Sequence, residues 1–185
     1  MKNILLLAVL LIFQNATAQY TLPVTFDTPD VIYTLTDFGG NSSSVIEDPN
    51  NLGNHIVQVT KITGAETWAG TTIGSTVSFT ASVPFSEIRT KMSIRVWSPD
   101  AGIPVRFKLE DATNNGITVE TEAMTTVAGG WETLVFDFAM QAEGTAALVI
   151  GNTYDKASVF FNFGAVGEEK TYFFDDVKVL APDIL

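Results

Sequence analysis

Two stretches of alternating charged and apolar residues carry most of the side chains in this sequence that could do chemistry. They flank the turn Asn114-Asn115-Gly116 and present Arg106, Lys108, Glu110, Glu120 and Glu122. Because successive side chains of a β-strand point to opposite faces, the charged groups of each stretch share one face of a strand. Guanidinium, ammonium and carboxylate groups arranged in this way can form hydrogen bonds to the hydroxyl groups of a ligand.

The same spacing is compatible with two different roles for these residues. Cross-strand Arg–Glu and Lys–Glu pairs also stabilise ordinary solvated sheet surfaces. Alternatively, the Cα atoms of Glu120 and Glu122 should lie roughly 6.6 Å apart in a strand. Glycosidases use pairs of carboxyl groups about 5–5.5 Å or about 6.5–9.5 Å apart. A solvated surface and a catalytic pair therefore stay open beside recognition.

The elements that must position these residues are short strands. Helical periodicity is nearly absent, and runs rich in Val, Ile, Thr and Phe alternate with clusters of Gly, Pro, Asn and Asp such as "DFGGNSSS", "EDPNNLGN" and "TNNG". This pattern predicts an all-β fold, a two-sheet antiparallel β-sandwich of jelly-roll type. A short helical turn is expected around Ala139 to Ala142. The predicted strands are 23–27, 31–36, 55–62, 76–82, 88–97, 104–110, 117–124, 131–138, 158–163 and 171–179.

Alternation within these strands predicts which side chains face the core. Met92, Ile94 and Val96 should be buried, and so should Val159, Phe161 and Phe163. The opposite faces of the middle strands would then form one surface that combines aromatic rings with hydrogen-bonding groups, as a sugar site requires. Its expected members are Arg95, Trp97, Arg106, Lys108, Glu110, Glu120, Glu122, Phe160 and Asn162.

The first residues have the features of a secretory signal peptide. Lys2 precedes an uncharged apolar run over 4–13, and Ala16-Thr17-Ala18 matches a small-x-small cleavage site. We therefore expect residues 1–18 to be removed and residues 19–185 to form a single domain outside the cytoplasm, extracellular or periplasmic. No other apolar run approaches the length of a membrane span, so membrane insertion is not expected.

Composition narrows the range of partners. The chain of 185 residues has no cysteine and a formal net charge of −11. A chain this acidic repels nucleic-acid phosphates, which excludes nucleic acid as an expected partner. Without cysteine, disulfides and thiolate metal sites are impossible. Neutral polysaccharide and a hard cation remain compatible with this composition.

Several motifs, taken together, resemble a known group of proteins. "NLGNHIVQVTKITGAETWAG", "VWSPDAGIPVRFKLED", "GGWETLVFDF", "KASVFFNFG" and "KTYFFDDVKVL" occur in an order that resembles galactose-binding-like β-sandwich domains of secreted bacterial polysaccharide-utilisation proteins. The resemblance covers about Tyr20 to Leu180. It implies a carbohydrate-binding module, which could act beside a glycoside hydrolase or within a surface glycan-uptake complex.

The resemblance also implies roles for particular residues. Such modules commonly hold a structural calcium where the first and last strands meet, and the matching positions are Asp27, Asp175 and Asp176. Aromatic side chains form the sugar platform of related modules. Trp68 in "ETWAG" and Trp97 in "VWSPD" are the candidates here, although a core role for Trp97 stays open.

Catalysis finds little support in the remaining residue types. His55 is the single histidine, so with no cysteine neither a common zinc site nor a Cys–His dyad can form. No G-x-S-x-G motif is present. Jelly-roll glucan hydrolases carry a third acid where this chain has Met124, and a lyase-type pair would require His55 and Tyr172 to meet.

The sequence thus predicts a secreted, non-catalytic module that binds polysaccharide, with a neutral β-glucan such as laminarin as the expected ligand. Two alternatives remain open. One is a structural or adhesive β-sandwich without a discrete sugar site. The other is a small jelly-roll glycan hydrolase or lyase.

Overall fold

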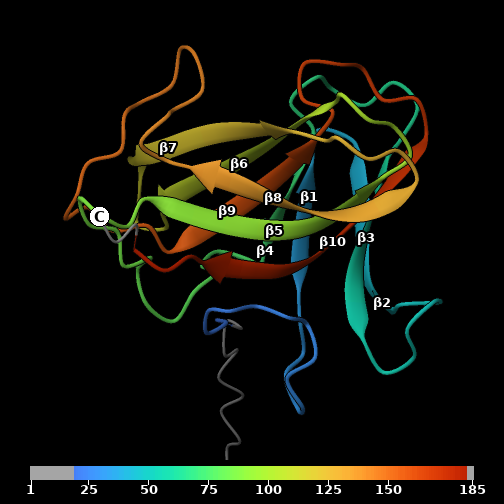
Figure 1. The fold of residues 1–185 in the computed structure, drawn as a ribbon, viewed down its shortest axis with the longest axis horizontal. Coiled ribbons are helices and arrows are strands. Elements are labelled where there is room, and N and C mark those ends of the chain that lie inside the picture. Colours follow the sequence, from blue (N-terminus) through green and yellow to red (C-terminus); the bar gives the residue numbers. More distant parts are fainter. Residues whose placement is uncertain (1–18, 183–185) are drawn as a thin grey trace, which may run out of the picture.

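Ten strands make up the regular structure of the described part of the chain (Figure 1). The computed structural model describes residues 19–182, and the predicted signal peptide lies outside them. The strands are β1 (Leu35–Phe38), β2 (Asn41–Glu47), β3 (His55–Lys61), β4 (Gly70–Ile73), β5 (Lys91–Ser98), β6 (Pro104–Asp111), β7 (Asn114–Met124), β8 (Gly130–Asp137), β9 (Lys156–Phe161) and β10 (Lys170–Val179).

The strands form two five-stranded sheets. One sheet has the order β1-β4-β9-β6-β7 and the other has the order β2-β3-β10-β5-β8, and every pairing is antiparallel. Among the hydrogen-bonded pairings, only two are between strands that follow one another in sequence, namely β2–β3 and β6–β7. The other connections cross between or within the sheets, as in a jelly roll. The predicted all-β sandwich is confirmed.

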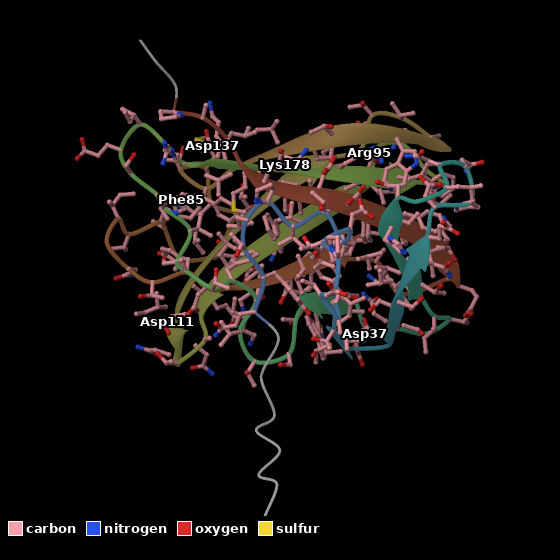
Figure 2. The ribbon with its side chains drawn as sticks, turned by 90° about the horizontal axis from the view of Figure 1, so that it is seen from below. Asp37, Phe85, Arg95, Asp111, Asp137 and Lys178 are labelled. Carbon is pink, nitrogen blue, oxygen red and sulfur yellow. The ribbon has the colours of Figure 1, made fainter. Side chains whose placement is uncertain are left out.

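Figure 2 shows the two sheets edge-on as two layers. Arg95, Asp137 and Lys178 lie in the layer of β5, β8 and β10, and Asp37 and Asp111 lie in the layer of β1 and β6. β5 and β6 therefore belong to different sheets, although they follow one another in sequence. The prediction that Arg95 and Trp97 share a face with Arg106 is wrong, because the 99–103 connection crosses from one sheet to the other.

The core lies between the sheets and follows the predicted alternation. Met92, Ile94 and Val96 of β5 are fully buried, and Phe107 of β6 packs edge-to-face on Phe136 of β8 with ring centroids 5.3 Å apart. Burying each side chain of this size contributes about 1.5–3 kcal/mol relative to leaving it in water. The inner faces thus stabilise the sandwich, and the side chains of the outer faces are not needed for this packing.

Two predicted strands are not strands, and two strands were missed. The segments 23–27 and 76–82 make only isolated bridges, Val24 to Val177 and Tyr20 to Phe79. β2 carries the polar letters "NSSS", which resemble a loop because this edge strand exposes one face to water. β4 is short and begins with glycine, so its local pattern is weak, yet all four residues are buried.

The described residues contain no helix, and hence none that could cross a membrane. The predicted helical turn near Ala139 is a single hydrogen-bonded turn, in which the Met140 N–H donates to the Asp137 carbonyl over 2.9 Å. The segment that follows pairs laterally with β7, since the Ala142 N–H donates to the Glu120 carbonyl. This pairing uses backbone groups that a longer helix would need.

Candidate functional site

A cleft of about 500 Å³ lies on the outer face of the β1-β4-β9-β6-β7 sheet. Its floor is formed by β4, β9 and β6, and its walls come from β1, from the loop before β4 and from the loop after β8. Five predicted side chains line it: Trp68, Arg106, Lys108, Glu110 and Glu120. Glu122 stands beside it, bonded to Arg106. The structure thus brings together six of the seven residues predicted to bind carbohydrate.

One half of the cleft is a run of aromatic rings. The Trp68 side chain is 50% exposed and is stacked on Phe38, with centroids 6.3 Å apart and planes inclined by 15°. Phe38 meets Phe160 edge-to-face at 5.5 Å, and Phe160 meets Phe163 at 5.8 Å. A ligand can therefore follow a continuous apolar path from Trp68 into the cleft.

Gly70, the first residue of β4, makes room for these rings. A Cβ atom at this position would lie 2.7 Å from ring carbons of both Phe38 and Phe160. Separations under about 3 Å do not occur in real packing, so any side chain here would displace the rings. The glycine in "TWAGT" is required by this close approach and not by an unusual backbone conformation.

Lys61 fixes the loop that carries Trp68. Its buried ammonium donates hydrogen bonds to the carbonyls of Thr67 at 3.5 Å, Phe161 at 3.3 Å and Asn162 at 3.0 Å. Burial lowers the pKa of Lys61, but these carbonyl acceptors oppose the cost of desolvating the charge. The Gly164 N–H also donates to the Thr67 carbonyl over 2.9 Å. The Trp68 loop is thereby bound to the β9–β10 connection.

The other half of the cleft is a ladder of ion pairs. The Arg106 guanidinium forms ion pairs with Glu120 at 3.0 Å and with Glu122 at 2.7 Å. The same guanidinium lies 3.6 Å above the Phe163 ring. Lys108 bonds Glu110 at 2.9 Å, and Lys156 approaches the same carboxylate at 3.4 Å. These contacts hold the charged side chains in fixed positions. Each carboxylate keeps further lone pairs that can accept hydrogen bonds from a ligand.

A loop extends the sheet beyond its edge strand β7. The Ala142 N–H donates to the Glu120 carbonyl over 2.7 Å, and the Thr121 hydroxyl donates to the Met140 carbonyl over 2.9 Å. Thr145, whose hydroxyl donates to the Ala142 carbonyl over 2.7 Å, then lines the cleft. The loop both protects the edge strand and closes one wall of the cleft.

The sequence predicted several residues of the cleft lining only in part. Phe160 was predicted on this face by alternation, and Lys156 and Ser158 share its parity in β9. Phe163 was predicted to be buried, which is wrong. Asn162 has φ = 48° and ends the strand, so the alternation does not continue and Phe163 joins the cleft. Phe38 lay in a segment interpreted as a turn.

Trp97 lies on the outer face of the opposite sheet. It stands directly across from Trp131 of β8 and from Phe173 of β10. Trp97 is partly exposed and belongs neither to the core nor to the cleft. The predicted sugar platform is therefore divided, with Trp68 in the cleft and Trp97 on the other side of the molecule.

The three acidic residues predicted to hold calcium each have another partner. Asp27 accepts hydrogen bonds from the His55 N–H and ring, at 2.6 and 3.0 Å, and Asp176 pairs with Lys178 at 3.0 Å. Asp175 is buried and lies 3.6 Å from Arg95. Within the described part of the chain, no group of three or more Asp, Glu or His side chains is placed to hold a metal ion. A calcium shell of six to eight oxygens at these residues would therefore need backbone carbonyls as further ligands and would have to compete with the present partners.

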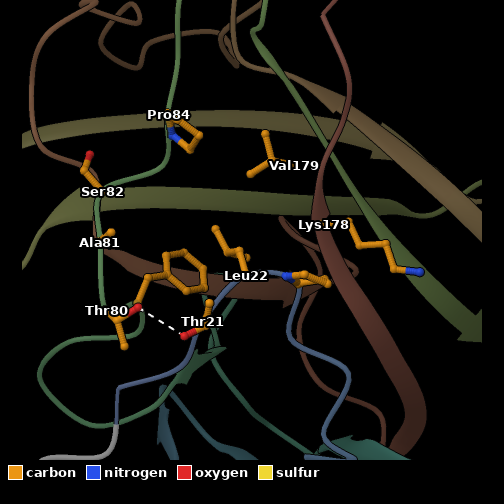
Figure 3. Close-up of a pocket in the computed structure, with 10 residues that line it drawn as sticks. Thr21, Leu22, Thr80, Ala81, Ser82, Pro84, Lys178 and Val179 are labelled. Carbon is orange, nitrogen blue, oxygen red and sulfur yellow. Dashed lines mark hydrogen bonds between the residues drawn. The ribbon is translucent and has the colours of Figure 1, made fainter.

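A third region, the apolar pocket of Figure 3, holds none of the predicted site residues. Leu22, Phe79, Pro84 and Val179 line its volume of about 450 Å³, and a hydrogen bond of 3.3 Å joins the hydroxyls of Thr21 and Thr80. Lys178 is the one charged residue among its lining. It offers few of the polar groups that orient a ligand, so the cleft is the stronger candidate.

His55 and Tyr172, the two residues of the lyase-type pair, lie in different surroundings. Tyr172 is buried in the core, stacked on Phe161 with centroids 4.8 Å apart, and burial raises the pKa of its hydroxyl. His55 is exposed and bonded to Asp27. The lyase-type pair of His55 and Tyr172 is therefore not available to a substrate.

Solved structures provide the comparison with known proteins. No family model matches the chain, and no curated protein matches its sequence. The family 11 carbohydrate-binding module from Clostridium thermocellum, solved with a β-1,3-1,4-mixed-linked tetrasaccharide, aligns with a TM-score of 0.53 and 16% identity over 84% of this chain and 93% of the module. The CBM22-1 xylan-binding domain from Paenibacillus barcinonensis aligns with a TM-score of 0.51 and 17% identity over 88% and 94%. The chain shares its fold with these two carbohydrate-binding modules.

An enzyme structure contains a similar part. The structure of an exo-β-agarase aligns with a TM-score of 0.60 and 12% identity over 88% of this chain. The chain spans only 25% of that agarase. At such identities the similarity establishes the fold, and the choice of ligand must come from the side chains of the cleft.

We predict that Gly70→Ala disturbs the aromatic half of the cleft. The new methyl group must displace Phe38 and Phe160, so the variant should lose about 1–3 kcal/mol of unfolding free energy, measured by urea denaturation. Gly116→Ala is the matched control, because its Cβ would meet only the Asn114 side chain, at 3.2 Å. A Gly70→Ala variant as stable as the control would contradict the close approach.

Asp175 should make stability depend on pH. Burial has the largest effect on this carboxyl group and raises the pKa of Asp175 to about 6. Hydrogen bonds from the Asp176 N–H and from Asn54, together with the charge of Arg95, lower the pKa and offset only part of this rise. The folded state therefore holds a proton that the unfolded chain, with a pKa of 3.8, has released. This contribution to stability is complete below pH 3.8 and is lost as the pH rises through 6.

The variant Asp175→Asn isolates this effect. From pH 4 to pH 7, wild type should lose roughly 2–3 kcal/mol of unfolding free energy relative to the variant, since each pKa unit corresponds to about 1.4 kcal/mol. Urea denaturation at several pH values measures the difference. A constant difference across this range would show that Asp175 stays ionised in the folded protein.

Proposed function

We propose that this chain is a secreted, non-catalytic module that binds polysaccharide through the cleft on the β1-β4-β9-β6-β7 sheet. One observation carries the proposal: the half-exposed Trp68 begins a run of contacting rings that leads directly into a ladder of oriented charged groups. Rings that pack on the apolar faces of pyranoses and charged groups that bond their hydroxyls are the two contacts a sugar polymer needs.

Binding begins at the aromatic half. Trp68 is half exposed while its stacking on Phe38 fixes its orientation, so little conformational entropy is lost when a sugar ring stacks on it. The next sugar units of the bound glycan lie over Phe160 and Phe163. They reach Glu110, Glu120 and Arg106, whose hydrogen-bonding groups face the cleft. Part of these contacts is water-mediated in shallow clefts, which keeps the affinity modest.

Charge favours a neutral ligand. The cations that line the cleft, Arg106, Lys108 and Lys156, each have a carboxylate partner. An anionic polysaccharide would have to displace Glu110 or Glu120 from these pairs. A neutral glycan can add hydrogen bonds to the pairs without breaking them, which supports a neutral ligand, and within that class we propose a β-glucan such as laminarin.

An exported module of this kind would work in the extracellular space or the periplasm, beside a glycoside hydrolase or within a surface glycan-uptake complex. The similarity of its fold to the mixed-linkage glucan and xylan modules supports polysaccharide as the class of partner.

Affinity electrophoresis tests the proposal. The chain is run through native gels that contain laminarin, mixed-linkage glucan, xylan, mannan, agarose or alginate, and retardation by one neutral glucan is expected. Trp68→Ala should weaken that retardation about tenfold, the value of one good stacking contact. Ile88→Ala is the control, because Ile88 is similarly exposed but lies outside the cleft.

Other results would favour the alternatives. Unretarded migration in every gel would support a structural or adhesive module, in which the ion pairs serve only to stabilise the sheet. Release of reducing ends or unsaturated sugars from any of these glycans would identify a hydrolase or lyase.

The sequence resemblance predicts a structural calcium, whereas the partners that the structure gives to the same acids favour a fold that needs none, and a melting experiment distinguishes the two. Because Asp27, Asp175 and Asp176 are already paired, we expect the Tm to be the same in millimolar calcium chloride and in excess chelator. A rise in Tm with calcium that disappears in Asp175→Asn would instead place the ion at this position.

A further inference from the structure

A second group of aromatic rings lies on the outer face of the other sheet, away from the cleft. Trp131 of β8, Trp97 of β5 and Phe173 of β10 stand directly opposite one another in the strand register. The Trp97 and Phe173 rings meet edge-to-face at 5.4 Å, and the Trp131 and Phe173 centroids are 6.4 Å apart. All three are partly exposed.

A loop turns this row of rings into a small notch. The β2–β3 loop folds over the outer face beside the rings, and Asp48, Pro49 and Asn50 form one wall of a pocket of about 180 Å³. The loop is ordered by its own hydrogen bonds: the Asp48 N–H donates to the Asn54 carbonyl at 2.7 Å, and the Asp48 carboxylate accepts from the Asn50 N–H at 2.9 Å. The notch therefore exists without a ligand.

Arg95 holds the ring of Trp131 in place. Its guanidinium lies 4.1 Å above that ring, and Asp175 anchors the guanidinium at 3.6 Å. A cation over an indole contributes about 0.5–1 kcal/mol at exposed sites. The arrangement fixes the rings that line the notch, so a ligand would meet a preorganised surface.

We propose that this notch is a second carbohydrate site, which receives a single neutral sugar ring. The aromatic rings offer surfaces for the C–H groups of a pyranose, while the side-chain amide of the exposed Asn50 offers both a donor and an acceptor for its hydroxyls. The volume decides the size of the occupant. At about 180 Å³ the notch is smaller than the roughly 300–1,000 Å³ of sites for drug-sized ligands, so it accepts a chain end or a single-residue branch.

The notch does not depend on the proposed function of the cleft. The two sites lie on different sheets and share no residue. If both bind, one molecule bridges two glycan chains, because the cleft and the notch face away from each other. Binding at the notch can therefore be measured whether or not the cleft binds.

Tryptophan fluorescence can observe the notch alone. The sequence has three tryptophans, so in Trp68→Phe the emission comes only from Trp97 and Trp131. We expect titration of this full-length variant with methyl β-D-glucopyranoside, and with the matching galactoside, mannoside and xyloside, to give a saturable change in emission with at least one of the four.

Two further variants, each added to Trp68→Phe, test the location. Trp97→Ala should weaken the response at least about tenfold. Asn50→Ala should also weaken it, and since Asn50 is an exposed loop residue this variant should keep the stability of the parent. Val135→Thr, on the same strand as Trp131 but outside the notch, should bind like the parent.

The outcomes separate clearly. A saturable response that is weakened by Asn50→Ala and unaffected by Val135→Thr supports the notch. No response to any of the four glycosides, or a response unchanged in Asn50→Ala and Trp97→Ala, would overturn it. Loss of polysaccharide retardation in Trp68→Ala, with the fluorescence response retained in Trp68→Phe, would show two independent sites.

Discussion

Alternation of side chains along each strand is the constraint on which the whole molecule depends. One side of every central strand must be apolar, since the two sheets can pack only if Met92, Phe107, Phe136 and their neighbours exclude water between them. The other side of the same strands is free of that demand. The cleft uses Arg106 and Lys108, which stand between the buried residues of β6. The core and the candidate cleft thus use opposite faces of the same strands.

Outer sheet faces become sites only where loops cover them. The ladder of ion pairs on β6 and β7 would be an ordinary solvated surface without its walls. The loop after β8 adds Thr145 on one side, and the loop before β4 adds Trp68 on the other. The latter loop is bound by the buried ammonium of Lys61, which joins carbonyls of two connections distant in sequence. The buried ammonium of Lys61 thereby helps to orient the solvent-exposed ring of Trp68.

Both faces of the sandwich carry rings beside polar groups, yet they differ in scale. On one sheet the rings lead into an open cleft of about 500 Å³ with a floor of paired charges. On the other, three rings and one loop enclose about 180 Å³. The difference follows from the loops, because the β2–β3 loop folds close against its sheet, whereas the loops around the cleft stand at its edges. The same sandwich therefore carries two outer hollows of different size.

The sequence by itself determined the fold class, the inner faces of the strands and most of the charged members of the cleft. Arg106, Lys108, Glu110, Glu120 and Glu122 could be grouped because β6 and β7 form a hairpin, in which local alternation and a short turn decide which residues meet. Tertiary structure alone decided that β5 lies in the other sheet, which moved Trp97 away from the cleft. It also brought Phe38, Trp68 and Phe163 together from three separate loops and strand ends. Sheet order and loop position depend on pairings between residues far apart in the chain, and a local pattern of period two carries no information about which strand lies beside which.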